Sequence, residues 1–180
     1  MRRNTWKLVA MFSFVMLLGT RGAAWAANPA TISVTVTIQS LSVSATGAIA
    51  FGTVTSSSST VSSTSSTVTN DGNVTETFSL SLTNPGTWTA VQAAPSVAEQ
   101  YALLAEFNSA APAGGSFTYA NHALSTSSVA ASGTKFAGDQ TGLSLAATST
   151  RNLWFRFDAP TSTAVTTQQT ITVTVTAAAG

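Results

Sequence analysis

The sequence predicts an all-β fold, a single antiparallel β-sandwich of the immunoglobulin-like kind with about seven to nine strands. Apolar and polar residues alternate with a period of two in several segments, which is typical of strands that have one buried and one solvated face. Ser and Thr fill most of the polar positions, and β-branched Thr suits a pleated surface. Clusters of Asn, Asp, Pro and Gly separate the alternating segments and indicate turns.

The first 26 residues precede this β pattern and have the composition of a secretory signal peptide. A basic start is followed by an apolar stretch over residues 8–18, which is shorter than the roughly 20 residues of a membrane-spanning helix. Ala24-Trp25-Ala26 fits the small-x-small pattern of a cleavage site. The alternative is an uncleaved membrane anchor. We expect a secreted, periplasmic or cell-surface protein whose mature domain spans residues 27–180 and has no membrane span.

Charge is scarce, at 7% of residues, and is distributed unevenly along the chain. Four of the seven basic residues lie in the predicted signal peptide, so the mature part carries three basic against six acidic residues, a formal net charge of −3. A mildly acidic protein lacks the electrostatic attraction on which nucleic-acid and anionic-membrane binding depend, so we expect neither partner. The absence of Cys excludes disulfides and thiolate metal sites.

The first alternating segment of the mature chain spans residues 31–38 and contains neither charge nor proline. Burying its four apolar side chains gives about 6–12 kcal/mol, whereas ordering about eight backbone residues costs about 8–16 kcal/mol. Association between chains has a further cost, so we expect closure within one chain unless the fold leaves a groove that a neighbour fills. The candidate strand-donor or pairing edge consists of Ile32, Val34, Val36 and Ile38.

The remaining elements follow along the chain. A bend is expected near Gln39 and Ser40, because the apolar positions then change from even to odd numbers. One strand is expected at the end of the Ser/Thr-rich stretch 55–69. Asp71-Gly72 predicts a hairpin turn, because this dipeptide tolerates positive φ angles. Four later segments are expected to direct apolar stripes into the core: Phe78, Leu80 and Leu82; Tyr101, Leu103, Ala105 and Phe107; Leu153, Phe155 and Phe157; Ile171, Val173 and Val175.

Two short motifs resemble a known family. Residues 51–54 (FGTV) and 68–73 (VTNDGN) resemble the F-G-x-V element and the following x-V-x-N-x-G strand end of hydin-type immunoglobulin-like domains. The resemblance implies a sandwich of about seven strands with a structural or interaction role. A weaker likeness depends on the order of four segments along the chain: the alternating first strand, the FGTV motif, residues 101–104 (YALL) and the final TITVTVT strand. This order is similar to secreted spore-coat-U and archaic chaperone–usher pilin domains, which usually carry cysteines. Both likenesses suit a bacterial protein.

Residues that carry chemistry are few. His122 is the single histidine, and it has no recognisable nucleophile or orienting-acid motif, so we expect a hydrogen-bonding role and no enzyme activity. Residues 70–73 and Asp139 lack the several carboxylates of a calcium site, and we expect no metal and no cofactor. Trp154 is the one candidate platform for a glycan, because it alternates with the predicted core stripe. The alternative for Trp154 is burial beneath a loop.

These observations predict an exported, non-catalytic structural or interaction module whose partners are other proteins or further copies of itself. Two alternatives stay open. The first is a filament or coat subunit that assembles by donating the strand at the mature N-terminus to a neighbour. The second is a carbohydrate-binding module that uses Trp154.

Overall fold

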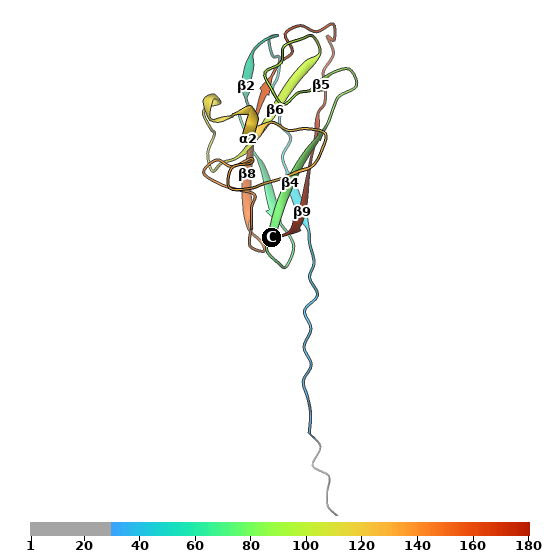
Figure 1. Cartoon of the computed structure of the whole chain (residues 1–180), viewed down its shortest axis with the longest axis vertical. Coiled ribbons are helices and arrows are strands. Elements are labelled where there is room, and N and C mark those ends of the chain that lie inside the picture. The colour runs from blue at the N-terminus through green and yellow to red at the C-terminus, as the bar shows by residue number, and fades with distance from the viewer. Residues whose placement is uncertain (1–29) are drawn as a thin grey trace, which may run out of the picture. The chain divides into compact units, whose positions relative to one another are not determined.

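The computed structural model describes residues 30–180, and its compact unit spans Ile38–Gly180. Nine strands in two sheets make this unit an all-β sandwich, which confirms the predicted fold class (Figure 1). The first strand of the sandwich begins at Val43, and the start of the mature domain at residue 27 stays a prediction. The predicted signal peptide, residues 1–26, lies outside the described residues. Within residues 30–180, no helix has the length and apolar character that crossing a membrane requires.

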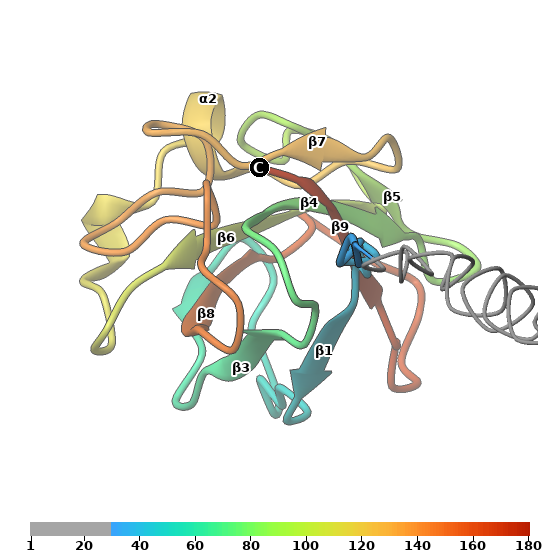
Figure 2. The same ribbon diagram turned by 90° about the horizontal axis from the view of Figure 1, so that it is seen from below.

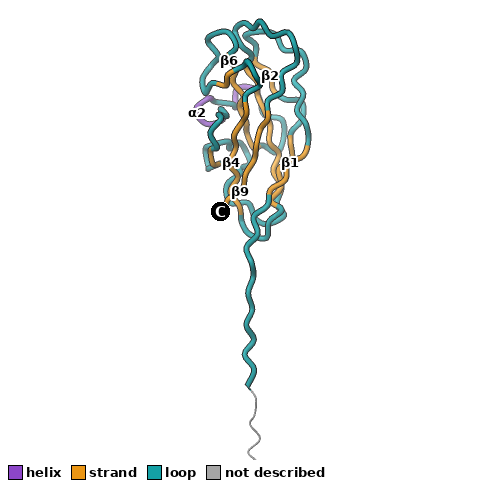
Figure 3. The backbone as a smooth tube through the Cα atoms, turned by 90° about the vertical axis from the view of Figure 1, so that its right-hand side faces the viewer, coloured by secondary structure: helices purple, strands orange, loops and turns teal. Residues whose placement is uncertain are grey.

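The larger sheet has β8 at its centre. Its strands lie in the order β1 (Val43–Thr46), β3 (Ser66–Asn70), β8 (Thr150–Asp158), β6 (Gln100–Phe107) and β5 (Thr89–Ala90), and β2 (Ser59–Val61) also pairs with β8. The smaller sheet has the order β7 (Val129–Ala130), β4 (Glu76–Thr83) and β9 (Thr172–Ala179). Figure 3 shows β4 and β9 side by side. All pairings are antiparallel except that of β5 with β6.

The core lies between the two sheets and is built from alternate side chains. In β4 the positions of Phe78, Leu80 and Leu82 are buried, whereas the Ser and Thr between them are half-buried or exposed. β8 directs Leu153, Phe155 and Phe157 into the same core, as the period of two predicts. The other predicted stripes also contribute, although the apolar residues of β9 are only half-buried. That partial burial places β9 at an edge of the core.

The predicted strand at the end of residues 55–69 is present in two pieces. β2 and β3 pair with successive parts of β8, and Val61 opposes Arg156 whereas Ser66 opposes Leu153. Four residues, 62–65, therefore face two residues of β8, which is a bulge-like interruption of the ladder. Ser62 bridges the interruption, because its N–H donates to the Phe155 carbonyl over 2.8 Å.

The turn at Asp71-Gly72 exists, but the prediction of a hairpin is wrong. The strands on its two sides, β3 and β4, belong to different sheets, so residues 70–76 connect one layer to the other. Gly72 does not have the positive φ that the hairpin prediction assumed. Glycine is required there for space, because a Cβ atom would lie 2.6 Å from the Ser40 carbonyl oxygen and would also overlap the Glu76 carboxylate.

The outer face of the larger sheet has a cover of its own. β6 is buried on both faces, and its outward side chains Ala102 and Leu104 lie beneath the segment that holds η1 (Gly114–Ser116) and α2 (Tyr119–His122). Phe117 from this segment completes a second, smaller apolar cluster with Trp154 of β8. The strand pattern alone did not predict this cover, because it is formed by a loop.

Truncating the core should destabilise the sandwich. Leu80→Ala removes a side chain with no exposed surface, so the free energy of unfolding should fall by about 2–5 kcal/mol. Urea unfolding followed by circular dichroism measures this change. Thr126→Ala, in an exposed loop, is the control and should stay within about 0.5 kcal/mol of the parent. Equal effects of the two substitutions would contradict the core described above.

Candidate functional site

The four predicted donor residues form the most exposed apolar feature of the described residues. Ile32, Val34, Val36 and Ile38, which we call the apolar stripe, are 88%, 87%, 86% and 79% exposed. Residues 30–42 form no strand, so the expected closure of this segment within its own chain is not observed. A contiguous apolar surface of this kind is typical of an interaction site.

Asn73 holds the end of the apolar stripe. Its side-chain N–H donates to the Ile38 carbonyl over 2.8 Å, and its side-chain oxygen accepts from the Ser40 N–H over 2.8 Å. The Asn73 backbone N–H also donates to the Ser40 carbonyl over 3.1 Å. One residue thus satisfies three backbone groups of the chain that leads from the stripe into β1.

Glu76 continues this attachment inside the sandwich. Its Oε1 atom accepts the Ser42 N–H over 2.7 Å, and the Asp71 N–H donates to the Ser42 carbonyl over 2.8 Å. Glu76 has no exposed surface, and its other carboxylate oxygen has no hydrogen-bond partner among the described residues. We refer to residues 70–76 together with their contacts to residues 38–42 as the exit clamp. The clamp fixes the place where the apolar stripe leaves the sandwich.

Sequence reasoning missed the exit clamp, although one signal of it was present. Glu76 has the same even numbering as Phe78 and Leu80, so the alternation already placed this carboxylate on the buried face of β4. An inward-facing acid in a strand needs a partner, because burying an unpaired charge is costly. The identity of that partner, the Ser42 N–H, depends on the path of a distant segment and has no sequence signal.

β9 forms a free edge of the smaller sheet. It pairs with β4 on one side and has no strand on its other side within residues 38–180. Ile171, Val173, Val175 and Ala177 are half-buried against the core, whereas the Thr residues between them are exposed. β9 carries no charge and no proline, the usual protections of a strand edge. This edge is therefore suited to accept another strand.

β1 is the neighbour of β9 across the two sheets and is a poorer acceptor. The two strands lie near each other on one side of the sandwich (Figure 2). β1 is only four residues long, and Val43 is its single half-buried side chain. An incoming strand with four apolar side chains matches the four half-buried positions along β9 and not β1.

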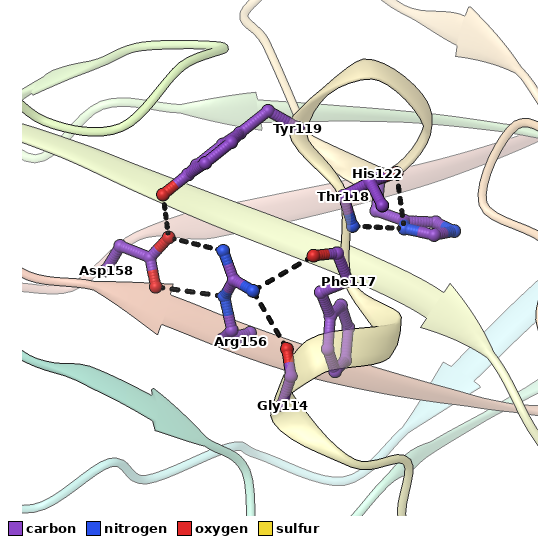
Figure 4. A network of polar contacts seen from close by, with 7 residues as sticks. All are labelled: Gly114, Phe117, Thr118, Tyr119, His122, Arg156 and Asp158. Carbon is purple, nitrogen blue, oxygen red and sulfur yellow. Dashed lines mark hydrogen bonds and ion pairs between the residues drawn. The ribbon is translucent and has the colours of Figure 1, made fainter.

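A polar network fastens the covering segment to the outer face of β8 (Figure 4). Arg156 donates two hydrogen bonds to Asp158, over 3.0 and 2.8 Å, and two more to the carbonyls of Gly114 and Phe117, over 2.9 and 3.0 Å. The Tyr119 hydroxyl donates to Asp158 over 2.8 Å. The guanidinium also lies 5.3 Å from the centre of the Tyr119 ring. These polar groups bind one another, so the network holds the covering segment against β8.

Trp154 lies in the cluster beneath this cover and not on an open sheet face. Only 9% of the residue is exposed, and its indole N–H donates to the Asn108 carbonyl over 2.9 Å. A glycan platform needs an accessible ring face, which this position does not offer. The structure therefore does not favour the carbohydrate-binding alternative at Trp154.

His122 is buried in the covering segment and is occupied by backbone contacts. Its Nδ1 accepts the Thr118 N–H over 2.9 Å, and its Nε2 lies 3.3 Å from the Ala137 carbonyl oxygen. Both ring nitrogens therefore contact backbone groups, which indicates a structural role for this imidazole. Across residues 30–180, no three His, Asp or Glu side chains gather into a possible metal site.

The Arg156 network should contribute to stability. Arg156→Ala leaves the nearly buried Asp158 carboxylate without its cationic partner, so the free energy of unfolding should fall by about 3 kcal/mol in chemical denaturation. Arg151→Ala is the matched control, because Arg151 donates only to the carbonyls of Thr141 and Thr150 and should cost about 1 kcal/mol. A loss no larger than that of the control would refute the role assigned to Arg156.

Both tyrosines should resist ionisation in the folded protein. Burial raises the pKa of Tyr101, and burial together with the hydrogen bond to Asp158 raises the pKa of Tyr119. Since the folded state keeps these protons more tightly, the stability they confer is present below the ordinary tyrosine pKa of about 10 and is lost as the pH rises through the higher native values. Phenolate absorbance should therefore appear together with unfolding. Ordinary titration of either tyrosine in the native protein, assigned with Tyr119→Phe, would contradict this expectation.

Comparisons of the chain with protein-family models, with curated proteins and with solved structures find no match. The likenesses of residues 51–54 and 68–73 to hydin-type domains, and of the strand order to pilin-like domains, therefore stay resemblances.

Proposed function

We propose that this protein is a non-catalytic structural subunit that joins further copies of itself by donating its N-terminal segment, residues 30–38, as a strand. The observation that carries the proposal is the apolar stripe, four alternate aliphatic side chains that are 79–88% exposed. An isolated extended segment of this pattern gains most by adding to a sheet edge, where its backbone groups are paired and one face is buried.

The acceptor supports the same proposal. The edge of β9 offers unpaired backbone groups and four half-buried apolar side chains, and a strand laid beside it would complete their burial. Full burial of four aliphatic side chains gives about 6–12 kcal/mol before the entropic costs of ordering and association. Backbone hydrogen bonds along the new ladder add to this gain.

The proposal places the protein outside the cytoplasm. This part rests on the signal-like sequence of residues 1–26, with its basic start, short apolar stretch and Ala24-Trp25-Ala26 site. A secreted or cell-surface coat or filament suits a mature chain with few charges and many Ser and Thr residues on its outer faces. The broader alternative is an interaction module that presents the same stripe and edge to a different protein.

Charges on the apolar face of the donated segment should abolish self-association. Val34→Asp/Val36→Asp places two carboxylates where two aliphatic side chains would be buried, so the variant should sediment as a monomer while the parent forms multimers. Analytical ultracentrifugation and electron microscopy of protein purified from the exported fraction measure this difference. Thermal unfolding should be unchanged, because neither valine lies within the compact unit.

The matched control places the same two charges on the other face of the same segment. Ser33→Asp/Thr35→Asp adds two carboxylates at positions that would point to solvent in the assembled sheet, so multimers should persist. A parent protein that stays monomeric at all concentrations, or multimers that form equally well in both variants, would overturn strand donation.

A further inference from the structure

We infer that the exit clamp sets the direction in which copies join, with Asn73 as a positioning residue that favours open head-to-tail chains over closed pairs. This inference rests on the proposed function. It concerns the polarity of association, which follows from where the apolar stripe leaves the sandwich and how the clamp holds it there.

The clamp lies at the C-terminal end of β9. Glu76 opposes Ala179 in the β4–β9 ladder, and the Gly180 N–H donates to the Thr75 carbonyl over 2.9 Å. Asn73, in the same connection, holds the Ile38 carbonyl. The apolar stripe of every copy therefore begins beside the end of that copy's own β9.

Alternation restricts how a donated segment can face β9. The inward side chains have even numbers in the segment and odd numbers in β9, so each inward pair joins an even to an odd residue. Two registers bring all four pairs together. The antiparallel register opposes Val34 to Val175 and Val36 to Val173. The parallel register opposes Val34 to Val173.

The two registers give different assemblies. In the parallel register, Ile38 of the donor lies at the Ala177 end of the acceptor's β9, so the exit clamps of the two copies lie side by side. The acceptor's own stripe can then pair with β9 of the donor. Such a contact is isologous, because both copies use the same surfaces, and it gives a closed dimer. In the antiparallel register, Ile38 of the donor lies at the Ile171 end. The acceptor's stripe then stays free for a third copy, and a heterologous chain stays open.

The clamp disfavours the parallel register. The donor has no spare residue between Ile38 and its clamp, because Asn73 already holds the Ile38 carbonyl. A parallel donor would have to bring its clamp to the place that the acceptor's residues 38–42 and 70–76 occupy. The antiparallel register brings only the far end of the segment, near Ile32, to that place. It also continues the antiparallel pairing of β7, β4 and β9.

Engineered cysteines test the direction, since the chain has no native cysteine. In the antiparallel register Ser33 lies opposite Thr176, so Ser33→Cys/Thr176→Cys should give a ladder of covalent multimers with a short bifunctional thiol reagent. Ser33→Cys/Thr172→Cys is the parallel control and should give little product, because Thr172 lies four residues away, about 13 Å along the strand. Non-reducing gel electrophoresis measures both.

Weakening the exit clamp should change which of the two cysteine pairs forms cross-linked products. Asn73→Ala removes both side-chain hydrogen bonds to residues 38–40, so the ladder of the 33/176 pair should fall several-fold and the product of the 33/172 pair should rise. Asn73→Asp keeps the acceptor for the Ser40 N–H and loses the donor to the Ile38 carbonyl, so it should lie between. Asn108→Ala is the control, because its side chain holds Asp139 in another loop. Thermal unfolding of each variant checks that it is folded.

The outcomes separate this inference from the proposed function. The Ser33→Cys/Thr172→Cys variant with native Asn73 could give covalent dimers or an intramolecular cross-link. Either product would overturn the antiparallel direction but keep strand pairing at β9. A folded Asn73→Ala variant with the parent's cross-linking pattern would overturn the role of Asn73. Parent multimers that link through neither pair would remove β9 as the acceptor. A parent protein that is monomeric and links through neither pair would overturn both proposals.

Discussion

Alternate burial is the constraint on which the rest of this structure depends. Every strand that faces the core contributes each second side chain to it, and Phe78, Leu80 and Phe155 show how completely those positions are shielded. With few charges on the chain, little else holds the two sheets together, and the one ion pair of residues 30–180 joins Arg156 to Asp158. The same constraint places Glu76 inside, where its carboxylate has to find the Ser42 N–H. Together with the bonds from Asn73, this hydrogen bond attaches residues 38–42 to the sandwich.

The strands were predictable from the sequence because their signal is local. Alternation placed the stripes of β4, β6, β8 and β9 on the core side, and the turn residues separated the strands. Long-range arrangement has no such local signal. Asp71-Gly72 has the composition of a hairpin turn, yet it connects two layers, and which strands pair is decided by packing far from the turn. The bulge at residues 62–65 divides one predicted strand for the same reason.

One part of the candidate site, the apolar stripe, was predictable from the sequence, whereas the exit clamp and the edge of β9 were not. The apolar stripe was visible as Ile32, Val34, Val36 and Ile38, because a run without charge or proline stands out in any sequence. Its closure within the chain was expected because association between chains has a further free-energy cost. The structure shows instead that Asn73 holds the Ile38 carbonyl and the Ser40 N–H at the start of the compact unit. The edge of β9 was not predictable, because an edge is defined by the absence of a neighbour.

The lack of space around Gly72 restricts which residues homologues of this protein can carry at this position. Any side chain at that position displaces Ser40 or Glu76, so glycine there is tied to the attachment of residues 38–42 rather than to the shape of a turn. Homologues that keep an alternating aliphatic leader should also keep a Gly-Asn pair followed three positions later by an acid. Homologues that lack the alternating aliphatic segment should be free to vary at all three positions, and such covariation would mark where the proposed strand donation was lost.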